Sequence, residues 1–281
     1  MASLTRPKPP LAVTAALGLA ACAALVMWRR TFREFVDYRV ENPETMPFDA
    51  APCSRVGLVA WWPLDSLNGA ESPDQGGLGH TLHAARSFAP LAALRFPYPS
   101  AAAGHLAGSL QFSSNQWLIG PNGPCFASEA AGVTAWVWMD AAAHVPTIVA
   151  KSAWPSDGWW LLTTTLDPFG SDRFLELGLA SGSGFFHVKS GYQMPLNAWH
   201  HVAVSMDNAA HEVRFFVDGE AFGPVHSNVP PWLVNWTHGI VVGDYDGSGR
   251  WPWDGRIDDV RVFNRALTGD DVRRAFRGEA P

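Results

Sequence analysis

The sequence Trp253-Asp-Gly-Arg-Ile-Asp-Asp-Val-Arg-Val-Phe-Asn-Arg-Ala-Leu267 decides the fold of this chain. Its alternating apolar residues predict a strand, and the residues after Phe263 predict a turn. Trp199-His-His-Val-Ala-Val204 predicts another strand, and Phe215-Phe-Val-Asp-Gly219 predicts a strand that ends in a hairpin turn. Three such segments in the last third of the chain indicate a domain built from strands.

Short apolar segments separated by Gly, Pro, Asn and Asp continue through the chain from Gly57 onward. Strands of this kind, with only one helical pattern at 269–277 behind the capping residue Thr268, predict an all-β sandwich. The expected strands lie at 57–62, 109–112, 133–139, 147–151, 159–165, 174–180, 185–189, 200–206, 212–217, 239–242 and 257–263.

Alternation within the strands predicts which side chains face the core. Val202 would face inward and His201 outward. In the closing strand Val260 and Val262 share a face with Asp258, so this carboxylate would approach the core. A carboxylate in that position needs backbone N–H groups, an arginine or a cation as a partner.

These segments resemble the LamG-like branch of the concanavalin A-like lectin/glucanase jelly rolls. The matching motifs are, in chain order, Trp62-Pro-Leu-Asp65, Val133-Thr-Ala-Trp-Val-Trp138, the Trp-His-His-Val-Ala strand, the Phe-Val-Asp-Gly hairpin and the Gly-x-Ile-Asp-Asp-Val-Arg ending. The resemblance covers residues 57–276. It implies an antiparallel two-sheet jelly-roll sandwich that serves mainly for recognition.

The composition excludes a disordered chain, because 47% of the 281 residues are hydrophobic and only 16% are charged. Residues 1–40 contain six basic and two acidic side chains. The rest of the chain, with 14 basic and 24 acidic side chains, carries a net charge of −10. So acidic a domain would repel a phosphate backbone, and we therefore expect no nucleic-acid partner.

Residues 11–30 predict a transmembrane anchor, since Leu11 to Trp28 contains no charge and Arg29-Arg30 follows. As a helix this stretch would span about 27 Å, which is close to the lower limit for crossing a bilayer. The favoured interpretation of this stretch is an uncleaved signal anchor, and two alternatives remain. Leu19-Ala-Ala-Cys22 resembles a bacterial lipobox, in which Cys22 would be acylated, and an ordinary cleaved signal peptide is the third interpretation.

The sequence thus predicts four parts: a tail at 1–10, the anchor at 11–30, an amphipathic stalk and proline-containing linker at 31–56, and the LamG-like domain at 57–281. Charges flanking the anchor are nearly balanced and do not fix its orientation. Because jelly rolls of this kind usually work outside the cytoplasm, we expect the domain to be periplasmic or extracellular, on a bacterial inner membrane. Cys53 and Cys125 could form a disulfide there.

Calcium is a candidate ligand, because many LamG-like domains bind it near a loop that resembles Asp74-Gln-Gly-Gly-Leu-Gly-His80. Asp65, Asp74 and Asp258 are the candidate metal residues. Leu78 stands where an oxygen-bearing side chain is usual, and calcium requires six to eight oxygens. The alternative is a turn in which aspartate and glycine satisfy the backbone.

Tryptophan is unusually frequent, with 14 residues. Those within strand patterns, such as Trp136, Trp138 and Trp199, are expected mostly in the core. Tryptophans among Pro, Asp, Asn and Gly could instead stack on sugar rings, contact a protein or fold back over the sandwich. These candidates are Trp154, Trp232, Trp236, Trp251 and Trp253.

Catalytic motifs are absent from the sequence, including the Glu-x-Asp-x-Glu strand of glycosidases on this fold. We therefore expect a non-catalytic, membrane-anchored interaction domain with no required cofactor. The favoured function is an accessory subunit that docks on a larger membrane protein complex, because the tether is short. The alternative is a surface-anchored carbohydrate-binding module of lectin type.

Overall fold

The computed structural model describes residues 53–86, 98–113, 116–140, 146–153, 157–164, 173–181, 184–234, 238–247 and 251–280. All of them belong to one compact unit, formed by residues 44–87 and 94–281. The predicted anchor at 11–30, most of the stalk and linker at 31–56, and Cys22 lie outside the described residues. Within the described ranges, no helix has the length and apolar character needed to cross a membrane.

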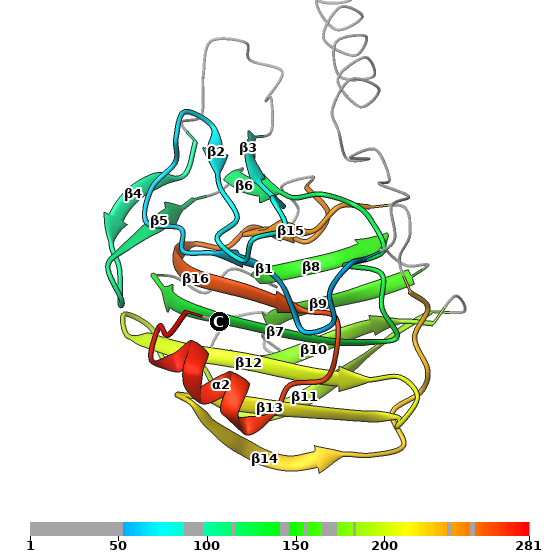
Figure 1. Ribbon diagram of the computed structural model, residues 1–281. Coiled ribbons are helices and arrows are strands. Elements are labelled where there is room, and N and C mark those ends of the chain that lie inside the picture. Colours follow the sequence, from blue (N-terminus) through cyan, green and yellow to red (C-terminus); the bar gives the residue numbers. More distant parts are fainter. Residues whose placement is uncertain are drawn as a thin grey trace, which may run out of the picture. The chain divides into compact units, whose positions relative to one another are not determined.

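Two eight-stranded antiparallel sheets form the domain (Figure 1), which confirms the predicted all-β two-sheet sandwich. The first sheet has the order β14-β13-β12-β7-β16-β5-β4, and β1 also pairs with β16. Its strands are β1 (Leu58–Trp62), β4 (Ser100–Ala103), β5 (Gly108–Phe112), β7 (Ala130–Met139), β12 (Trp199–Asp207), β13 (Glu212–Val217), β14 (Glu220–His226) and β16 (Gly255–Phe263).

The second sheet has the order β11-β10-β9-β8-β15-β6-β3-β2, and its strands β8 to β11 lie behind the first sheet in Figure 1. Its strands are β2 (Glu71–Ser72), β3 (Leu82–Arg86), β6 (Gln116–Ile119), β8 (Thr147–Ala153), β9 (Asp157–Thr164), β10 (Phe174–Ala180), β11 (Phe185–Gln193) and β15 (Val241–Val242). The apolar faces of the two sheets enclose a common core that includes Val137, Leu177 and Val202. Alternation along each strand leaves the opposite side chains on the outer faces.

The closing strand β16 departs from simple alternation. Its pairing with β7 is regular from Gly255 to Asp258, then shifts register before Arg261, and Asp259 has a φ of 49°. A β-bulge of this kind places an extra residue in one strand and changes which face the next side chains take. The prediction that Asp258 shares a face with Val260 is therefore wrong: Asp258 pairs with Trp136 on the outer face, whereas Val260 enters the core.

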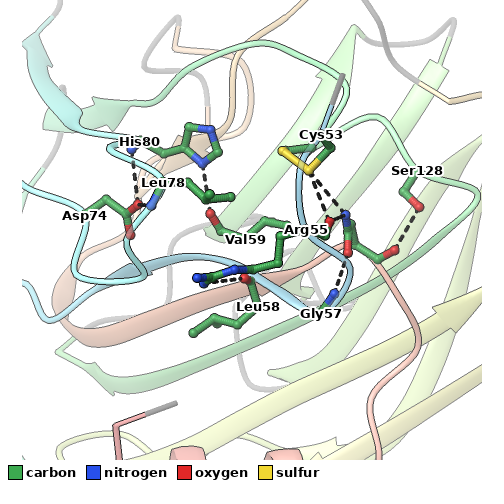
Figure 2. Close-up of a disulfide and its surroundings, with 11 residues drawn as sticks. Cys53, Arg55, Gly57, Leu58, Val59, Asp74, Leu78, His80 and Ser128 are labelled. Atoms are coloured by element: carbon green, nitrogen blue, oxygen red, sulfur yellow. Dashed lines mark hydrogen bonds between the residues drawn. A yellow bond between two sulfur atoms is a disulfide. The ribbon is translucent and has the colours of Figure 1, made fainter. Parts of the chain in front are cut away.

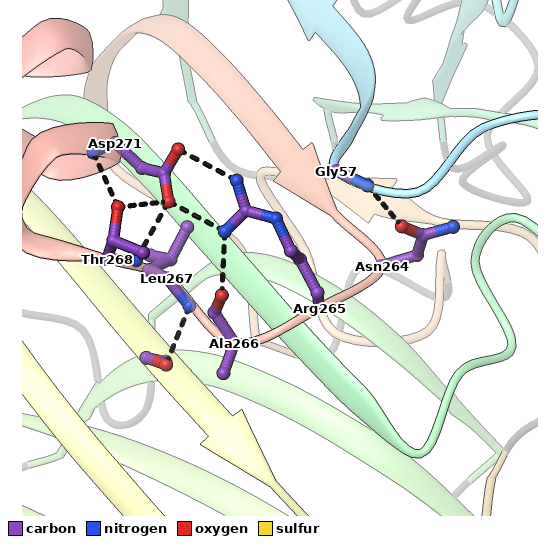
Figure 3. A network of polar contacts seen from close by, with 8 residues as sticks. Gly57, Asn264, Arg265, Ala266, Leu267, Thr268 and Asp271 are labelled. Atoms are coloured by element: carbon purple, nitrogen blue, oxygen red, sulfur yellow. Dashed lines mark hydrogen bonds and ion pairs between the residues drawn. The ribbon is translucent and has the colours of Figure 1, made fainter.

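Helix α2 (Gly269–Phe276) begins behind Thr268, as the sequence predicts. Thr268 Oγ1 accepts a hydrogen bond from the Asp271 N–H, and the Asp271 carboxylate accepts one from the Thr268 N–H, which makes a capping box. Asp271 also binds the guanidinium of Arg265 at 2.7 and 2.9 Å (Figure 3). The helix lies on the outer face of the first sheet, where Phe276 stacks on Trp136 at 5.2 Å between ring centroids.

A disulfide joins Cys53 to Cys125 (Figure 2), although the two residues are 72 positions apart. It fixes the start of the domain to the loop before β7. Asn264 strengthens the same junction, because its side chain accepts a hydrogen bond from the Gly57 N–H and donates one to the Arg55 carbonyl. The first residues of the domain are thus tied to the turn that follows β16.

Candidate functional site

Five side chains form one line across the outer face of the first sheet. Trp199 pairs with Trp138, Trp138 with Arg256, Arg256 with Gln111, and Gln111 with Ser100. We call Ser100, Gln111, Arg256, Trp138 and Trp199 the outer row. Because neighbouring strands lie about 4.8 Å apart, the row extends for about 19 Å across five adjacent strands, a length suited to an extended ligand.

The backbone geometry of β7 places the row on the surface. Val137 and Met139 enter the core, so the side chain of Trp138 between them projects outward. Trp138 and Trp199 are both half-buried. The expectation that the strand tryptophans lie mostly in the core is therefore wrong for these two. For Trp199 the sequence contained the signal, because Val202 was predicted to face inward on the same strand and alternation puts Trp199 on the opposite face.

Hydrogen bonds hold the row in one arrangement. Asp140 Oδ1 accepts a bond from the indole Nε1 of Trp138 at 2.8 Å, and Asp140 Oδ2 accepts one from Nε2 of Gln111 at 2.8 Å. Gln111 Oε1 in turn accepts a bond from Nε of Arg256 at 3.2 Å. The polar groups thus orient one another before any ligand arrives, which lowers the entropy lost on binding.

The aromatic part of the row has two differently oriented faces. The rings of Trp138 and Trp199 are 6.0 Å apart, with an interplanar angle of 62°. The guanidinium carbon of Arg256 lies 4.9 Å from the ring centroid of Trp138, which is within the range of a cation–π contact. An indole gives a large apolar face and an N–H group, and this combination suits a ligand with both apolar and hydroxyl surfaces.

The neighbouring part of the same face is covered by the protein itself. Trp136, only 2% exposed, stacks on His105 at 3.5 Å and on Phe276 of α2 at 5.2 Å. His201 lies against Trp136 at 5.4 Å, and neither of its ring nitrogens has a hydrogen-bond partner among the described residues. We call Trp136, His105, His201 and Phe276 the covered cluster.

A buried carboxylate holds the loop that covers this cluster. Asp258 Oδ2 accepts hydrogen bonds from the N–H groups of His105 and Leu106 at 2.9 and 3.2 Å. Burial raises the pKa of Asp258 to about 7 despite these two bonds, and it lowers the pKa of His201 to about 3. The covered cluster is therefore a dry environment beside the half-exposed outer row.

Two of the predicted loop tryptophans do not form a surface. Trp253 and Trp232 are 0% and 2% exposed and belong to the central core, so their prediction as ligand or interface residues is wrong. Asn208 fixes the loop at Trp232, because its side chain bonds both the N–H and the carbonyl of that residue. Tertiary folding brings these loops back over the sandwich, and burial of their large apolar rings stabilises that arrangement.

Trp251 lies on the outer face of the second sheet and is half-buried. Its ring contacts Tyr245 at 4.6 Å, and Tyr245 contacts Trp160 at 5.0 Å. Tyr245 and Trp160 are 0% and 2% exposed, so this stack is largely covered and offers less aromatic surface than the outer row. The other two candidates, Trp154 and Trp236, lie outside the described residues.

The three candidate calcium residues bind three separate pieces of backbone. Asp74 accepts hydrogen bonds from the N–H groups of four residues in and beside its loop, part of which Figure 2 shows. Asp65 accepts one from the Gly108 N–H at 2.7 Å. Asp258 accepts its bonds from the N–H groups of His105 and Leu106. Among the described residues, no three His, Cys, Asp or Glu side chains come together in a way that could hold a metal ion. Calcium binding here stays a prediction.

Solved structures with the same fold include binding domains. Domain 4 of AbnA, a GH43 extracellular arabinanase from Geobacillus stearothermophilus, in complex with arabinotriose, has a TM-score of 0.60 and 18% identity, and the match covers 79% of this chain and 99% of that domain. The binding domain of Paraclostridial Mosquitocidal Protein 1 has a TM-score of 0.56 and 13% identity.

The botulinum neurotoxin serotype D binding domain has a TM-score of 0.54 and 15% identity. In both toxin comparisons the match covers 79% of this chain but 52% of the toxin domain, so the chain spans about half of their length. At these identities the likeness shows the fold alone.

No curated protein sequence matches the chain. The family model of the concanavalin A-like lectin/glucanases superfamily matches residues 112–273, more than half of the sequence, and the chain belongs to that family.

Proposed function

We propose that this protein is a non-catalytic carbohydrate-binding module and that an oligosaccharide lies along the outer row. The observation that carries the proposal is the fixed, half-exposed pair Trp138 and Trp199 beside Arg256 and Gln111. Aromatic faces next to oriented polar groups suit sugar rings, which have apolar C–H faces and hydroxyl edges. Membership of a lectin-containing family and the likeness to an arabinotriose-bound domain support the same function.

Replacing both Trp138 and Trp199 by Ala tests the proposal. Affinity electrophoresis of the folded domain through gels that contain soluble polysaccharides should show retardation of the wild type and its loss in the double variant. A matched control is Trp251→Ala, which removes a half-buried indole from the other sheet and should leave the retardation unchanged. No retardation of the wild type by any polysaccharide in a broad panel would contradict carbohydrate binding.

Docking on a larger membrane complex, which the sequence favoured, stays a prediction. Of the two tryptophans that could contact such a complex, Trp232 is buried and Trp236 lies outside the described residues. Co-migration of the full chain with a large complex in native electrophoresis of source membranes would support this function. A chain that migrates alone and is retarded by glycan would support carbohydrate binding instead.

We further propose that the domain works outside the cytoplasm, tethered by the predicted anchor at residues 11–30. The Cys53–Cys125 disulfide supports this location, because such bonds persist in oxidising compartments. Alkylation of the protein in intact source cells, with and without prior reduction, should label these two cysteines only after reduction. Labelling without reduction would contradict the proposed location.

A further inference from the structure

The acceptor groups of the outer row are already engaged within the protein. Each oxygen of Asp140 accepts one hydrogen bond, from Trp138 and from Gln111, and Gln111 Oε1 accepts the bond from Nε of Arg256. Part of the acceptor capacity at the row is thus used within the protein, although each of these oxygens keeps a lone pair.

The row also contains donors that the described residues leave unused. Among the described residues, the only hydrogen bond of the Arg256 side chain is the one from Nε to Gln111, and none of the ion pairs involves Arg256. In the described part of the chain, the side chain of Trp199 makes ring contacts with Trp138 and His105 and no hydrogen bond from its indole N–H. A guanidinium presents its N–H groups as a planar fork that matches the two oxygens of a carboxylate.

We propose that the outer row selects acidic oligosaccharides, with a sugar carboxylate bound to the terminal nitrogens of Arg256 and the adjoining rings stacked on Trp138 and Trp199. This inference rests on the proposed carbohydrate-binding function and names the class of sugar. Arg256 is suited to the role because Gln111 and the ring of Trp138 fix its guanidinium in place. Little side-chain entropy is then lost when the carboxylate binds.

Arg256 also has a plain structural alternative. Residues 41–281 carry a net charge of −10, and Asp254 lies close enough to Asp140 for the two carboxylates to interact. This net charge repels any polyanion at long range, so the proposed contact depends on the local guanidinium fork and not on the overall charge. Arg256 could instead serve only to balance this local negative charge. The two roles differ in their effect on ligand choice, because charge balance within the protein gives no preference for a sugar carboxylate.

Pairs of polysaccharides that differ only in their carboxylates distinguish the two roles. Polygalacturonate, glucuronoxylan and alginate are each compared with their carboxyl-reduced forms by affinity electrophoresis of the folded wild-type domain. At least one acidic member should bind about tenfold more tightly than its reduced partner, since a charge-assisted bond contributes on the order of 1.4 kcal/mol or more. Addition of salt should reduce that preference.

Variants assign the preference to Arg256. R256Q should bind the acidic and reduced forms equally, and R256K, which keeps the charge but loses the planar fork, should retain part of the preference. Arg214 provides the matched control, because it is an exposed arginine on β13 of the same sheet, away from the row. R214Q removes the same charge and should bind like the wild type. Circular dichroism establishes that each variant is folded.

Several results would overturn the inference. Equal binding of acidic and reduced forms by the wild type would assign Arg256 to charge balance, as would an unchanged preference in R256Q. Acidic binding that persists in the Trp138 and Trp199 double variant would place the anion elsewhere on the domain. Retardation by neutral polysaccharides alone contradicts only the acidic preference, whereas no retardation by any polysaccharide contradicts the proposed function as well.

Discussion

Trp136 and Trp138 lie two positions apart on the same face of β7, yet they have different environments. Trp136 is 2% exposed and stacks between His105 and Phe276, whereas Trp138 is half-buried and bonds to Asp140 near the surface. Both side chains project from the same face of the strand, so the strand geometry does not distinguish them. The difference comes from α2 and from the loop at 104–107, which cover one half of the sheet face and leave the other half open.

This contrast shows that an outward position on a strand does not by itself make a binding residue. Beside the covered cluster, Val272 of the same helix packs with Phe216 and Leu267 in a small second core. The outer row has similar aromatic side chains, but these stay partly exposed. We therefore expect changes in the covered half to affect stability and changes in the open half to affect ligand binding.

The largest expected difference is between Trp136→Ala and Trp138→Ala. Removal of the buried Trp136 ring should lower the free energy of unfolding by about 3–5 kcal/mol, because it leaves a cavity against His105 and Phe276. Removal of Trp138 should cost only about 1–2 kcal/mol, for one hydrogen bond and one cation–π contact. Urea denaturation of the two variants measures both values, and equal losses would contradict the division of the face.

The next prediction uses two buried groups with opposite pH effects. Burial lowers the pKa of His201 from 6.5 to about 3, so the unfolded chain binds the extra proton as the pH falls below 6.5, and stability falls on acidification. Burial raises the pKa of Asp258 from 3.8 to about 7, so the folded chain binds the extra proton between these values, and stability falls as the pH rises. The two effects should largely cancel between about pH 4 and 6.5.

Single variants should reveal each effect. Asp258→Asn leaves the His201 effect alone, so relative to the wild type its stability should fall on acidification, by up to about 1.4 kcal/mol per pH unit. His201→Leu should show the opposite slope, with stability falling as the pH rises from 4 to 7. Chemical denaturation of both variants and the wild type from pH 4 to 8 gives the slopes. Parallel curves for all three proteins would mean that neither group titrates as proposed.

The smallest predicted effect concerns the cap of α2. Thr268→Ala removes the hydroxyl that binds the Asp271 N–H and should lower the free energy of unfolding by about 1 kcal/mol. Thermal denaturation measures the loss. The same variant should leave glycan retardation unchanged, because the outer row has no contact with the cap. A change in glycan binding without loss of fold would connect the two halves and weaken the comparison.

Much of the fold could be predicted from the sequence, because alternating apolar residues follow the strand period directly. The segments at 133–139, 200–206, 212–217 and 257–263 lie within β7, β12, β13 and β16. Strand β14 was missed because, as an edge strand, it is exposed or partly exposed throughout and has no apolar alternation to detect. The short strand β4 is also largely exposed, β2 has only two residues, and β6 is buried throughout, with four residues that are too few to show an alternation.

The site was less predictable. Loop composition selected Trp232 and Trp253, but composition does not tell whether a loop folds back over the core, and both are buried. Arg256 and Gln111 are far apart in the sequence, and only the pairing of β16 with β5 makes them neighbours. The spacing of residues along a single strand could not have predicted that these two side chains are neighbours.

The sequence by itself determined the family, the two-sheet sandwich and most inward positions, since these depend on local alternation and on motifs in chain order. Tertiary structure alone decided the rest. The bulge in β16 moved Asp258 to the outer face, α2 buried Trp136, and pairing in register brought Trp199, Trp138 and Arg256 into one row. Each of these depends on contacts between segments distant in the sequence, and the chain order of the residues does not specify which surface another segment will cover.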